Sequence, residues 1–349
     1  MIKKPFWKMP LVLTVCGLAF MLAGCDNGTN PVPTVPTFTV TFDSNGGSPV
    51  ASQRVREGGR VTAPTGIIGV PSAGLWYDVP DFAGWFDEDG EPWNFDTVVT
   101  EDITLAASWD GDPVRITAVA ANSVAAAVAH VNANTGAFTL AISQNVNSGT
   151  QTLSHPDTNL TIVGIGGPQQ ITLTGSGDKL FYVGPASGII DSISLTLGND
   201  IILMGRGQGP SFIMVRNGGR LYMEANARIT GHTTTSGSPA NGSGAAVFLE
   251  HNSTLTMRDN AEITGNRANY AGVNTYNTGN TAGGVFLRRA TSSLVMEGGS
   301  ITGNFRGAST PADVVLQLLS TATNPVPEYI YTKLTTDYAD KIGTVVARR

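Results

Sequence analysis

Carboxylates beside a basic residue are the first side chains to consider for chemistry, because such groups act as general acids, general bases or metal ligands. In residues 212–304, where one pattern repeats three times, the acids are spread over different corners of the pattern: Glu224, Glu250, Asp259, Glu262 and Glu297. Each has a structural explanation, either as a turn residue or as a partner for a stacked basic residue. We therefore predict no catalytic residue in this stretch.

Other candidate ligands also lack the spacing that a site needs. Four histidines are scattered over the chain without metal-ligand spacing: His130, His155, His232 and His251. The acidic run from Asp87 to Gly90 lacks the alternating oxygen ligands and the closing glutamate of an EF-hand, and it reads as a solvated turn. Gly164, Gly166 and Gly167 complete no GxGxxG or Walker motif. We predict no metal site and no cofactor.

Cys25 carries a more specific prediction. Residues 1–25 have the pattern of an export signal. A basic start is followed by an apolar run, residues 11–23, that is short for a permanent membrane-spanning helix. The sequence Leu22-Ala23-Gly24-Cys25 resembles the lipobox of bacterial lipoproteins. The resemblance implies cleavage before Cys25 and attachment of a diacylglycerol to its sulfur, so that lipid on Cys25 anchors the chain to a membrane. The alternative is an ordinary signal peptide in which the cysteine is accidental. The other cysteine, Cys16, lies inside the signal, so the mature chain has no internal disulfide.

The next segment and the charge balance limit the possible partners. Residues 26–37 are rich in Pro, Thr and Asn, and they read as an extended tether. Residues 38–109 hold eleven acids against three arginines, a net charge of −8, whereas residues 110–349 hold fifteen residues of each sign. Neither part offers a basic surface, so we predict no nucleic-acid partner.

Residues 38–109 have the pattern of a small β module. Apolar residues alternate with threonines from Phe38 to Phe42, and a glycine turn follows. The elements FDSNGG, Ala83-Gly84-Trp85 and a closing Trp109 resemble, in this order, the Listeria–Bacteroides repeat, also called the internalin B-repeat. The resemblance implies a β-grasp-like module of a bacterial surface protein. The connection from Gly66 to Pro80 is longer and more irregular than is usual in that family.

The elements that position most of these residues come from three copies of one phrase. Its isoleucines, each followed by Thr-Gly, lie 34 and then 38 residues apart, at Ile229, Ile263 and Ile301. Each copy contains three short strand-like runs and is too thin to enclose a core alone, so the copies must stack. Stacked coils of three strands form a parallel β-helix, which we predict for residues 110–349.

The same pattern predicts which side chains face inward. Because successive residues of a strand point to opposite faces, one leucine and one methionine of each copy are expected to stack inside: Leu221/Met223, Leu255/Met257 and Leu294/Met296. Tyr222, Thr256 and Val295 are then expected to face outward.

Stacking also predicts polar pairs between copies. Arg216, Glu250 and either Arg288 or Arg289 occupy equivalent positions, as do Arg228 and Glu262. Opposite charges should therefore lie side by side. Asn266 and Asn304 follow the Ile-Thr-Gly turn in two copies, which predicts a ladder of side-chain hydrogen bonds. The ladder should be interrupted in the first copy, where the equivalent residue is His232.

The ends of the β-helix need covers, because bare strand edges recruit other chains. Ser123 can cap a helix over about residues 123–134 that has one apolar face. We expect this helix to cap the amino-terminal end, with packing on the small module as the alternative. Residues 137–205 read as irregular first coils, and residues 312–349 as the carboxyl-terminal cap.

Two insertions supply candidate ligand contacts. His232 to Gly244 and Arg267 to Gly283 both leave after the Ile-Thr-Gly turn and return before the next strand, so we expect them as loops outside the strand ladders at one corner. The second contains Tyr270 and Tyr276, whose rings could stack on sugars or apolar groups, although a solvated loop is an equal alternative.

The repeats, above all GGSITGN at Gly298 to Asn304, resemble those of bacterial surface β-helix proteins of the adhesin type, and the expected right-handed β-helix is similar to that of pectin lyases. The fold class is thus mainly β: a β-grasp-like module, then a right-handed parallel β-helix with a capping helix. We interpret the chain as an exported, lipid-anchored envelope protein, expected at the outer membrane or cell surface in preference to the inner membrane, whose β-helix presents an interaction surface for a host or matrix protein or a glycan and performs no catalysis. A polysaccharide lyase or hydrolase and a passive structural spacer are the alternatives.

Overall fold

The computed structural model describes eleven stretches of the chain: residues 35–65, 69–70, 72–111, 113–175, 179–207, 210–234, 243–244, 246–269, 281–288, 291–317 and 345–348. Cys25 and the two candidate tyrosines, Tyr270 and Tyr276, lie outside the described residues. Within the described part, no helix has the length and apolar character that a membrane span needs.

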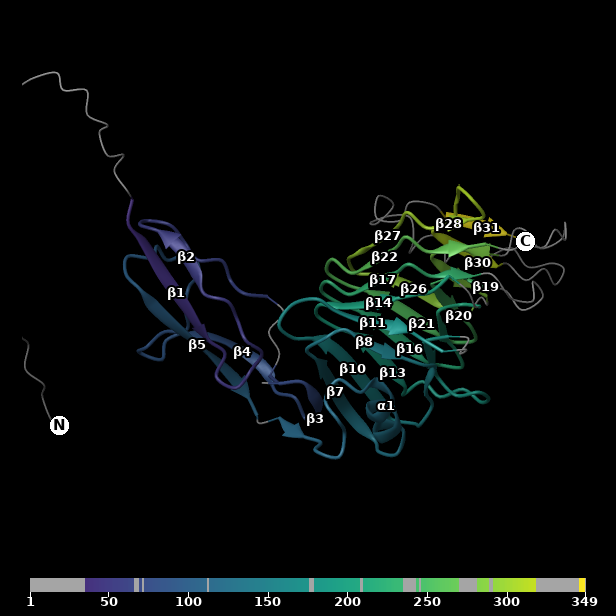
Figure 1. Ribbon diagram of the computed structural model, residues 1–349, viewed down its shortest axis with the longest axis horizontal. Coiled ribbons are helices and arrows are strands. Elements are labelled where there is room, and N and C mark those ends of the chain that lie inside the picture. Colours follow the sequence, from purple (N-terminus) through teal and green to yellow (C-terminus); the bar gives the residue numbers. More distant parts are fainter. Residues whose placement is uncertain are drawn as a thin grey trace, which may run out of the picture. The chain divides into compact units, whose positions relative to one another are not determined.

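A four-stranded sheet forms the first module (Figure 1). Its strands are ordered β2-β1-β5-β4, with bounds Thr37–Asp43 for β1, Gln53–Arg56 for β2, Asp81–Phe86 for β4 and Ile103–Asp110 for β5. The central pair, β1 and β5, is parallel, and each outer pair is antiparallel, which is the order of a β-grasp sheet. The inward residues of these strands form a separate core that includes Val40, Phe42, Trp85 and Leu105.

One strand within the module's sequence range belongs to the second part of the chain. Strand β3, Gly74–Tyr77, pairs antiparallel with β7, Gly136–Ile142, the first strand of the stacked coils. Strand β6, Val114–Arg115, pairs with the other side of β3. Leu75 is fully buried in the core of the coils. The irregular connection seen in the sequence thus supplies the edge strand of the first coil.

The stacked coils form a parallel β-helix built from three sheets, as predicted (Figure 1). The first sheet continues from β7 through β10 (Thr158–Gly164), β13 (Ser194–Leu197), β16 (Arg220–Met223), β21 (Thr254–Met257) and β26 (Ser293–Met296). The second sheet contains β8 (Val146–Ser148), β11 (Gln169–Leu173), β14 (Ile201–Met204), β17 (Arg228–Thr230), β22 (Glu262–Thr264) and β27 (Ser300–Thr302). The third contains β9 (Gln151–Leu153), β12 (Phe181–Val183), β15 (Ile213–Val215), β20 (Val247–Leu249), β25 (Val285–Leu287), β30 (Val314–Gln317) and β31 (Val345–Arg348).

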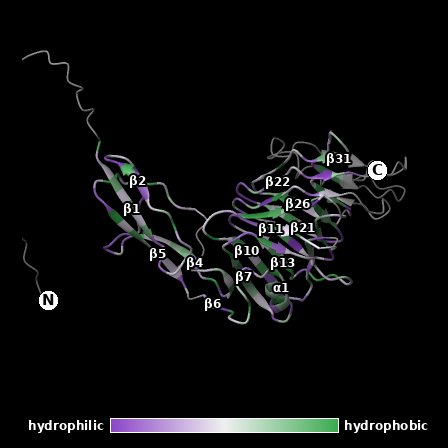
Figure 2. Cartoon of the chain, viewed as in Figure 1, coloured by the Kyte–Doolittle hydropathy of each residue, from purple (hydrophilic) through white to green (hydrophobic). Residues whose placement is uncertain are grey.

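Burial confirms which side chains face the interior of the coils and shows that one residue on the outer face is also buried. The stacked leucines and methionines are all buried, and hydrophobic residues lie in the strands of the coils (Figure 2). Tyr222 and Val295 are partly exposed, as expected of outward residues. Thr256 also points outward but is only 6% exposed. Its register partners are Tyr222 and Val295, and these larger neighbours cover the small threonine.

The predicted helix is present at the amino-terminal end of the coils. Helix α1 spans Val124–Asn132, and the Ser123 side chain accepts a hydrogen bond from the Ala126 backbone N–H, 3.3 Å away. Its buried face consists of Val124, Ala127, Val128 and Val131, which join the core of the first coils. The helix contacts β7, β9 and β10, so it caps the β-helix, and the alternative position on the module is wrong.

The two insertions do not lie wholly outside the ladders, which corrects the expectation for them. Their first residues form two strands of a further parallel ladder, β18 (Thr233–Thr234) and β23 (Arg267–Ala268). The ladder continues into β28 (Phe305–Arg306), which follows the last repeat and pairs antiparallel with β29 (Thr310–Pro311). Their last residues pair as β19 (Ser243–Gly244) and β24 (Thr281–Ala282). Ala282 packs with the outward rings Phe248 and Phe286, whose centroids lie 5.5 Å apart. The insertions are therefore anchored by strands at both ends.

Candidate functional site

Four of the five acidic side chains of the repeats are held in ion pairs. Arg258 bonds to Glu224 at 3.0 Å and to Glu297 at 2.7 Å, so one guanidinium joins three successive coils. The hydrogen bond with Glu297 is the main cause that raises the pKa of Arg258, and Glu224 adds to it. All three residues directly follow the stacked methionine of their coil, so the alternation Glu, Arg, Glu in the sequence is a signal that could have predicted this network, although it was not among the expected pairs.

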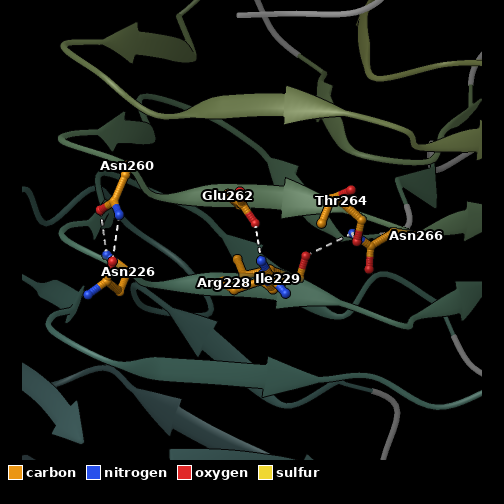
Figure 3. Close-up of polar contacts among 7 residues, drawn as sticks. All are labelled: Asn226, Arg228, Ile229, Asn260, Glu262, Thr264 and Asn266. Atoms are coloured by element: carbon orange, nitrogen blue, oxygen red, sulfur yellow. Dashed lines mark hydrogen bonds and ion pairs between the residues drawn. The ribbon is translucent and has the colours of Figure 1, made fainter. Parts of the chain in front are cut away.

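Two of the predicted charge pairs are present on the other faces, whereas Arg216 does not pair with Glu250 and lies over the Tyr182 ring instead, 4.5 Å from its centroid. Arg228 pairs with Glu262 across β17 and β22 (Figure 3), and Arg288 pairs with Glu250. Asp259, the remaining acid of the repeats, occupies a turn with a positive φ of 49°. The structural explanation of these five acids is therefore confirmed. Glu224 and Glu297 share Arg258, whereas Glu250 and Glu262 pair with separate arginines on the other two sheets.

The predicted asparagine ladder is buried at one corner of the coils. The Asn266 side-chain amide donates to Asn304 Oδ1 at 3.0 Å, and the Asn304 amide donates to Asp313 Oδ1 at 3.0 Å. Asn266 Nδ2 also donates to the backbone oxygen of Ile229 in the preceding coil (Figure 3). Asp313 lies outside the Ile-Thr-Gly phrase and was not foreseen. The ladder satisfies buried backbone groups that would otherwise destabilise the corner.

His232 ends the ladder, as expected. Its backbone N–H donates to Asn266 Oδ1 at 3.1 Å, and its ring stacks on Phe212 with centroids 4.9 Å apart. The ring nitrogen Nε2 lies 2.8 Å from the Pro210 carbonyl oxygen and donates to it. The pKa of His232 is lowered from 6.5 to about 4, mainly by burial; the Pro210 hydrogen bond opposes this shift, and the nearby charges of Arg206 and Lys179 add to it.

We expect the unfolding free energy to fall in mild acid because of His232. The folded-state pKa of about 4 lies below the ordinary value of 6.5, so this contribution is complete above pH 6.5 and is lost as the pH falls toward 4. The loss between pH 7 and pH 4.5 should be about 2 to 3 kcal/mol. Denaturant titrations at both pH values measure it. His232→Asn, which restores the residue of the other copies, should show a smaller difference, and an equal difference would contradict the assignment.

A second polar ladder, which the sequence did not predict, lies at an exposed corner. Asn226 donates to Asp200 Oδ1 at 2.9 Å, and Asn260 donates to Asn226 Oδ1 (Figure 3). Asp200 and Asn226 have positive φ angles of 58° and 61°, a conformation that aspartate and asparagine adopt more readily than most residues. Their role is to turn the chain between the first and second sheets.

A polar depression lies on the outer face of the first sheet. Its volume is about 290 Å³, and seven residues of β10, β13, β16 and the preceding turns line it: Asp157, Asn159, Asp191, Ser192, Ser194, Arg220 and Tyr222. Asn159, Ser194 and Arg220 are register partners on three adjacent strands. The depression therefore gathers two carboxylates, a guanidinium, an amide, two hydroxyls and a phenol from three coils.

Several contacts fix these groups in place. The Asp157 backbone N–H donates to Ser192 Oγ at 2.9 Å, and Ser194 Oγ donates to Asn159 Oδ1 at 2.6 Å. Arg258 lies over the Tyr222 ring, 5.3 Å from its centroid. Arg220 reaches Asp191 at 3.9 Å. The sequence did not indicate this site, because Asp157 and Asp191 lie in the first coils, outside the clear repeats.

The acidic run from Asp87 to Gly90 in the module forms a hydrogen-bonded turn. The Asp87 carboxylate accepts the backbone N–H groups of Asp89 and Glu91, at 3.1 Å and 2.9 Å, as in a closed turn. Among the described residues there is no group of three or more His, Cys, Asp or Glu side chains that could hold a metal ion.

Comparison with known proteins bears on the module alone. Residues 38–108 match the family profile of the Listeria-Bacteroides repeat domain, in agreement with the resemblance noted over residues 38–109. No curated protein and no solved structure matches the chain. The module that the chain carries indicates a surface-associated protein.

Proposed function

We propose that this chain is an exported, lipid-anchored envelope protein whose β-helix binds a saccharide in the depression on the first sheet. The observation that carries the proposal is the lining of that depression, which is polar and comes from three coils. Hydroxyl, amide, carboxylate and guanidinium groups are the donors and acceptors that a polyhydroxylated ligand can use. The volume of about 290 Å³ suits one unit of a polymer rather than a large apolar molecule.

The surroundings support binding on a rigid face. The strands that carry Asn159, Ser194 and Arg220 are each paired on both sides, so the backbone beneath the depression is fixed. Preorganised groups lose little conformational entropy when a ligand binds. The surface association indicated by the module is consistent with a ligand outside the cell.

Calorimetric binding to a panel of neutral, amino-bearing and acidic oligosaccharides, together with extracellular-matrix proteins, tests the proposal. We expect at least one saccharide to bind and no matrix protein to bind more tightly. If nothing on the panel binds, the passive spacer becomes the better account of the β-helix.

Cleavage of a polysaccharide is a second candidate, because the depression brings Asp157, Asp191 and Arg220 together. A pair of carboxylates can serve as acid and base or as nucleophile. Analysis of the panel saccharides after incubation distinguishes the two functions. New reducing or unsaturated ends that disappear in Asp157→Asn or Asp191→Asn would establish catalysis, and intact saccharides would leave binding as the function.

The anchor has its own test in Cys25→Ala. Lipid transfer needs the Cys25 thiol, so the variant should remain as an unlipidated precursor, and essentially all incorporation of labelled fatty acid should be lost. Metabolic labelling followed by immunoprecipitation measures this directly. Equal label in the variant and the wild type would exclude the anchor while leaving the saccharide site untouched.

A further inference from the structure

The depression on the first sheet has unbalanced charge. Two aspartates line it, and Arg220 is the single cation among the lining residues. Arg220 is 45% exposed and Asp191 82% exposed, and their 3.9 Å contact is long for an ion pair. Asp157 is exposed and makes no ion pair within the described part of the chain. The site therefore presents net negative charge to a ligand.

The neighbouring polar groups have unused hydrogen-bonding capacity. Ser192 Oγ accepts the Asp157 backbone N–H, which leaves its own proton available. Asn159 accepts from Ser194 through Oδ1, which leaves its side-chain N–H groups available. These donors suit the oxygen atoms of a sugar, whereas the carboxylates suit a group that only donates.

We infer that the ligand is a saccharide that bears protonated amines, an inference that rests on the proposed function. An ammonium group donates up to three hydrogen bonds and forms charge-assisted contacts with carboxylates such as Asp157. Hydroxyls on the same sugar occupy the Asn159 and Ser192 donors. An acidic saccharide would bring further negative charge against two aspartates, with only Arg220 to offset it.

The same reasoning favours a saccharide over a basic peptide. Peptides commonly bind a β protein by adding a strand to an exposed edge. Strands β10, β13 and β16 are interior strands of the first sheet, with a neighbour on each side, so they offer no free edge beneath the depression. Binding must then come from side chains alone, which a rigid, hydroxyl-rich ring can satisfy at low cost in entropy.

Three hexasaccharides and two variants test the inference with the purified full chain. The probes are a glucosamine hexamer, its N-acetylated counterpart and a galacturonate hexamer, titrated calorimetrically at pH 6 and low salt. We expect the glucosamine hexamer to bind at least tenfold more tightly than the N-acetylated one, and the galacturonate hexamer most weakly. Asp157→Asn should weaken glucosamine binding about fivefold and reduce its salt dependence. Asp259→Asn, a matched change at an exposed turn aspartate with positive φ, should leave binding unchanged.

The possible outcomes separate this inference from the proposed function. Equal binding of the amine and N-acetyl probes, or tighter binding of galacturonate, overturns the charge preference while a saccharide site stands. Equal loss in Asp157→Asn and Asp259→Asn overturns the assignment to this depression. A lysine hexapeptide that binds more tightly than every saccharide overturns the ligand class. Failure of all probes, together with failure of the wider panel, removes the proposed function itself.

Discussion

Replacement of Leu75 by aspartate is expected to destabilise the β-helix, although residue 75 lies within the sequence range of the module. Leu75 is fully buried in the core of the first coils, and β3 covers the edge of β7. An unpaired carboxylate at this position should cost about 4 kcal/mol. Val114→Asp is the matched control, because Val114 lies on β6 beside β3 and is 53% exposed. It should change the unfolding free energy by less than about 0.5 kcal/mol.

The distribution of tryptophan makes this prediction measurable. Four of the five tryptophans lie between residues 38 and 109, and the fifth, Trp7, lies in the stretch expected to be an export signal: Trp76, Trp85, Trp93 and Trp109 are the four. Fluorescence therefore reports the module and β3, whereas far-UV circular dichroism reports mainly the strands of the coils. We expect Leu75→Asp to lower the circular dichroism midpoint strongly. If the variant and the wild type have the same midpoint, β3 does not cap the β-helix.

The pairing of β3 with β7 also determines where a soluble fragment of the chain should begin. A chain that begins at residue 110 lacks β3, so it leaves the β7 edge and the position of Leu75 uncovered. Stability measurements are better made on a chain that starts before Thr37, where the first strand begins.

Ile263→Asp is expected to have the second large effect, because Ile263 is fully buried between Ile229 and Ile301. A carboxylate there would have no partner in the apolar stack, and we expect a loss of about 4 kcal/mol or failure to fold. Thr264→Asp is the matched control on the same strand, since Thr264 is partly exposed and points to the opposite face. It should cost less than about 1 kcal/mol.

Urea unfolding of the two variants at pH 7 decides this prediction. Similar midpoints for Ile263→Asp and Thr264→Asp would contradict the inward and outward assignment in the second sheet. Thr256→Asp is unsuitable as a control, because Thr256 is covered by its neighbours even though it points outward.

The coils were predictable because the same physical requirement recurs at fixed spacing. Leu255 and Met257 alternate with outward residues, and their equivalents recur in the neighbouring copies, so periodicity alone identifies the core. The Ser123 cap and the apolar face of α1 were equally local signals. Charge pairs such as Arg228 with Glu262 followed from register once the coils were aligned.

Features that depend on distant or irregular segments were not predictable in this way. Strand β3 carries no repeat, and its partner in β7 lies about sixty residues further along the chain, so nothing local indicates the pairing. The depression depends on turn residues, Asp157 and Asp191, in coils whose repetition is weak. The burial of Thr256 depends on the size of the side chains stacked on either side of it. The alternation of inward and outward residues along a strand carries no information about that size.

The most direct test of the binding account compares Arg220→Ala with Arg228→Ala. Both arginines begin strands of one coil, have nearly equal exposure of 45% and 46%, and pair with one acid, but only Arg220 lines the depression. The measurement is the dissociation constant of the tightest saccharide of the panel for each variant. The account predicts wild-type binding for Arg228→Ala and about a tenfold change for Arg220→Ala: tighter binding of an amine-bearing saccharide, which loses a repulsive cation, or weaker binding of a saccharide that Arg220 itself contacts. Equal affinities of the two variants would contradict it.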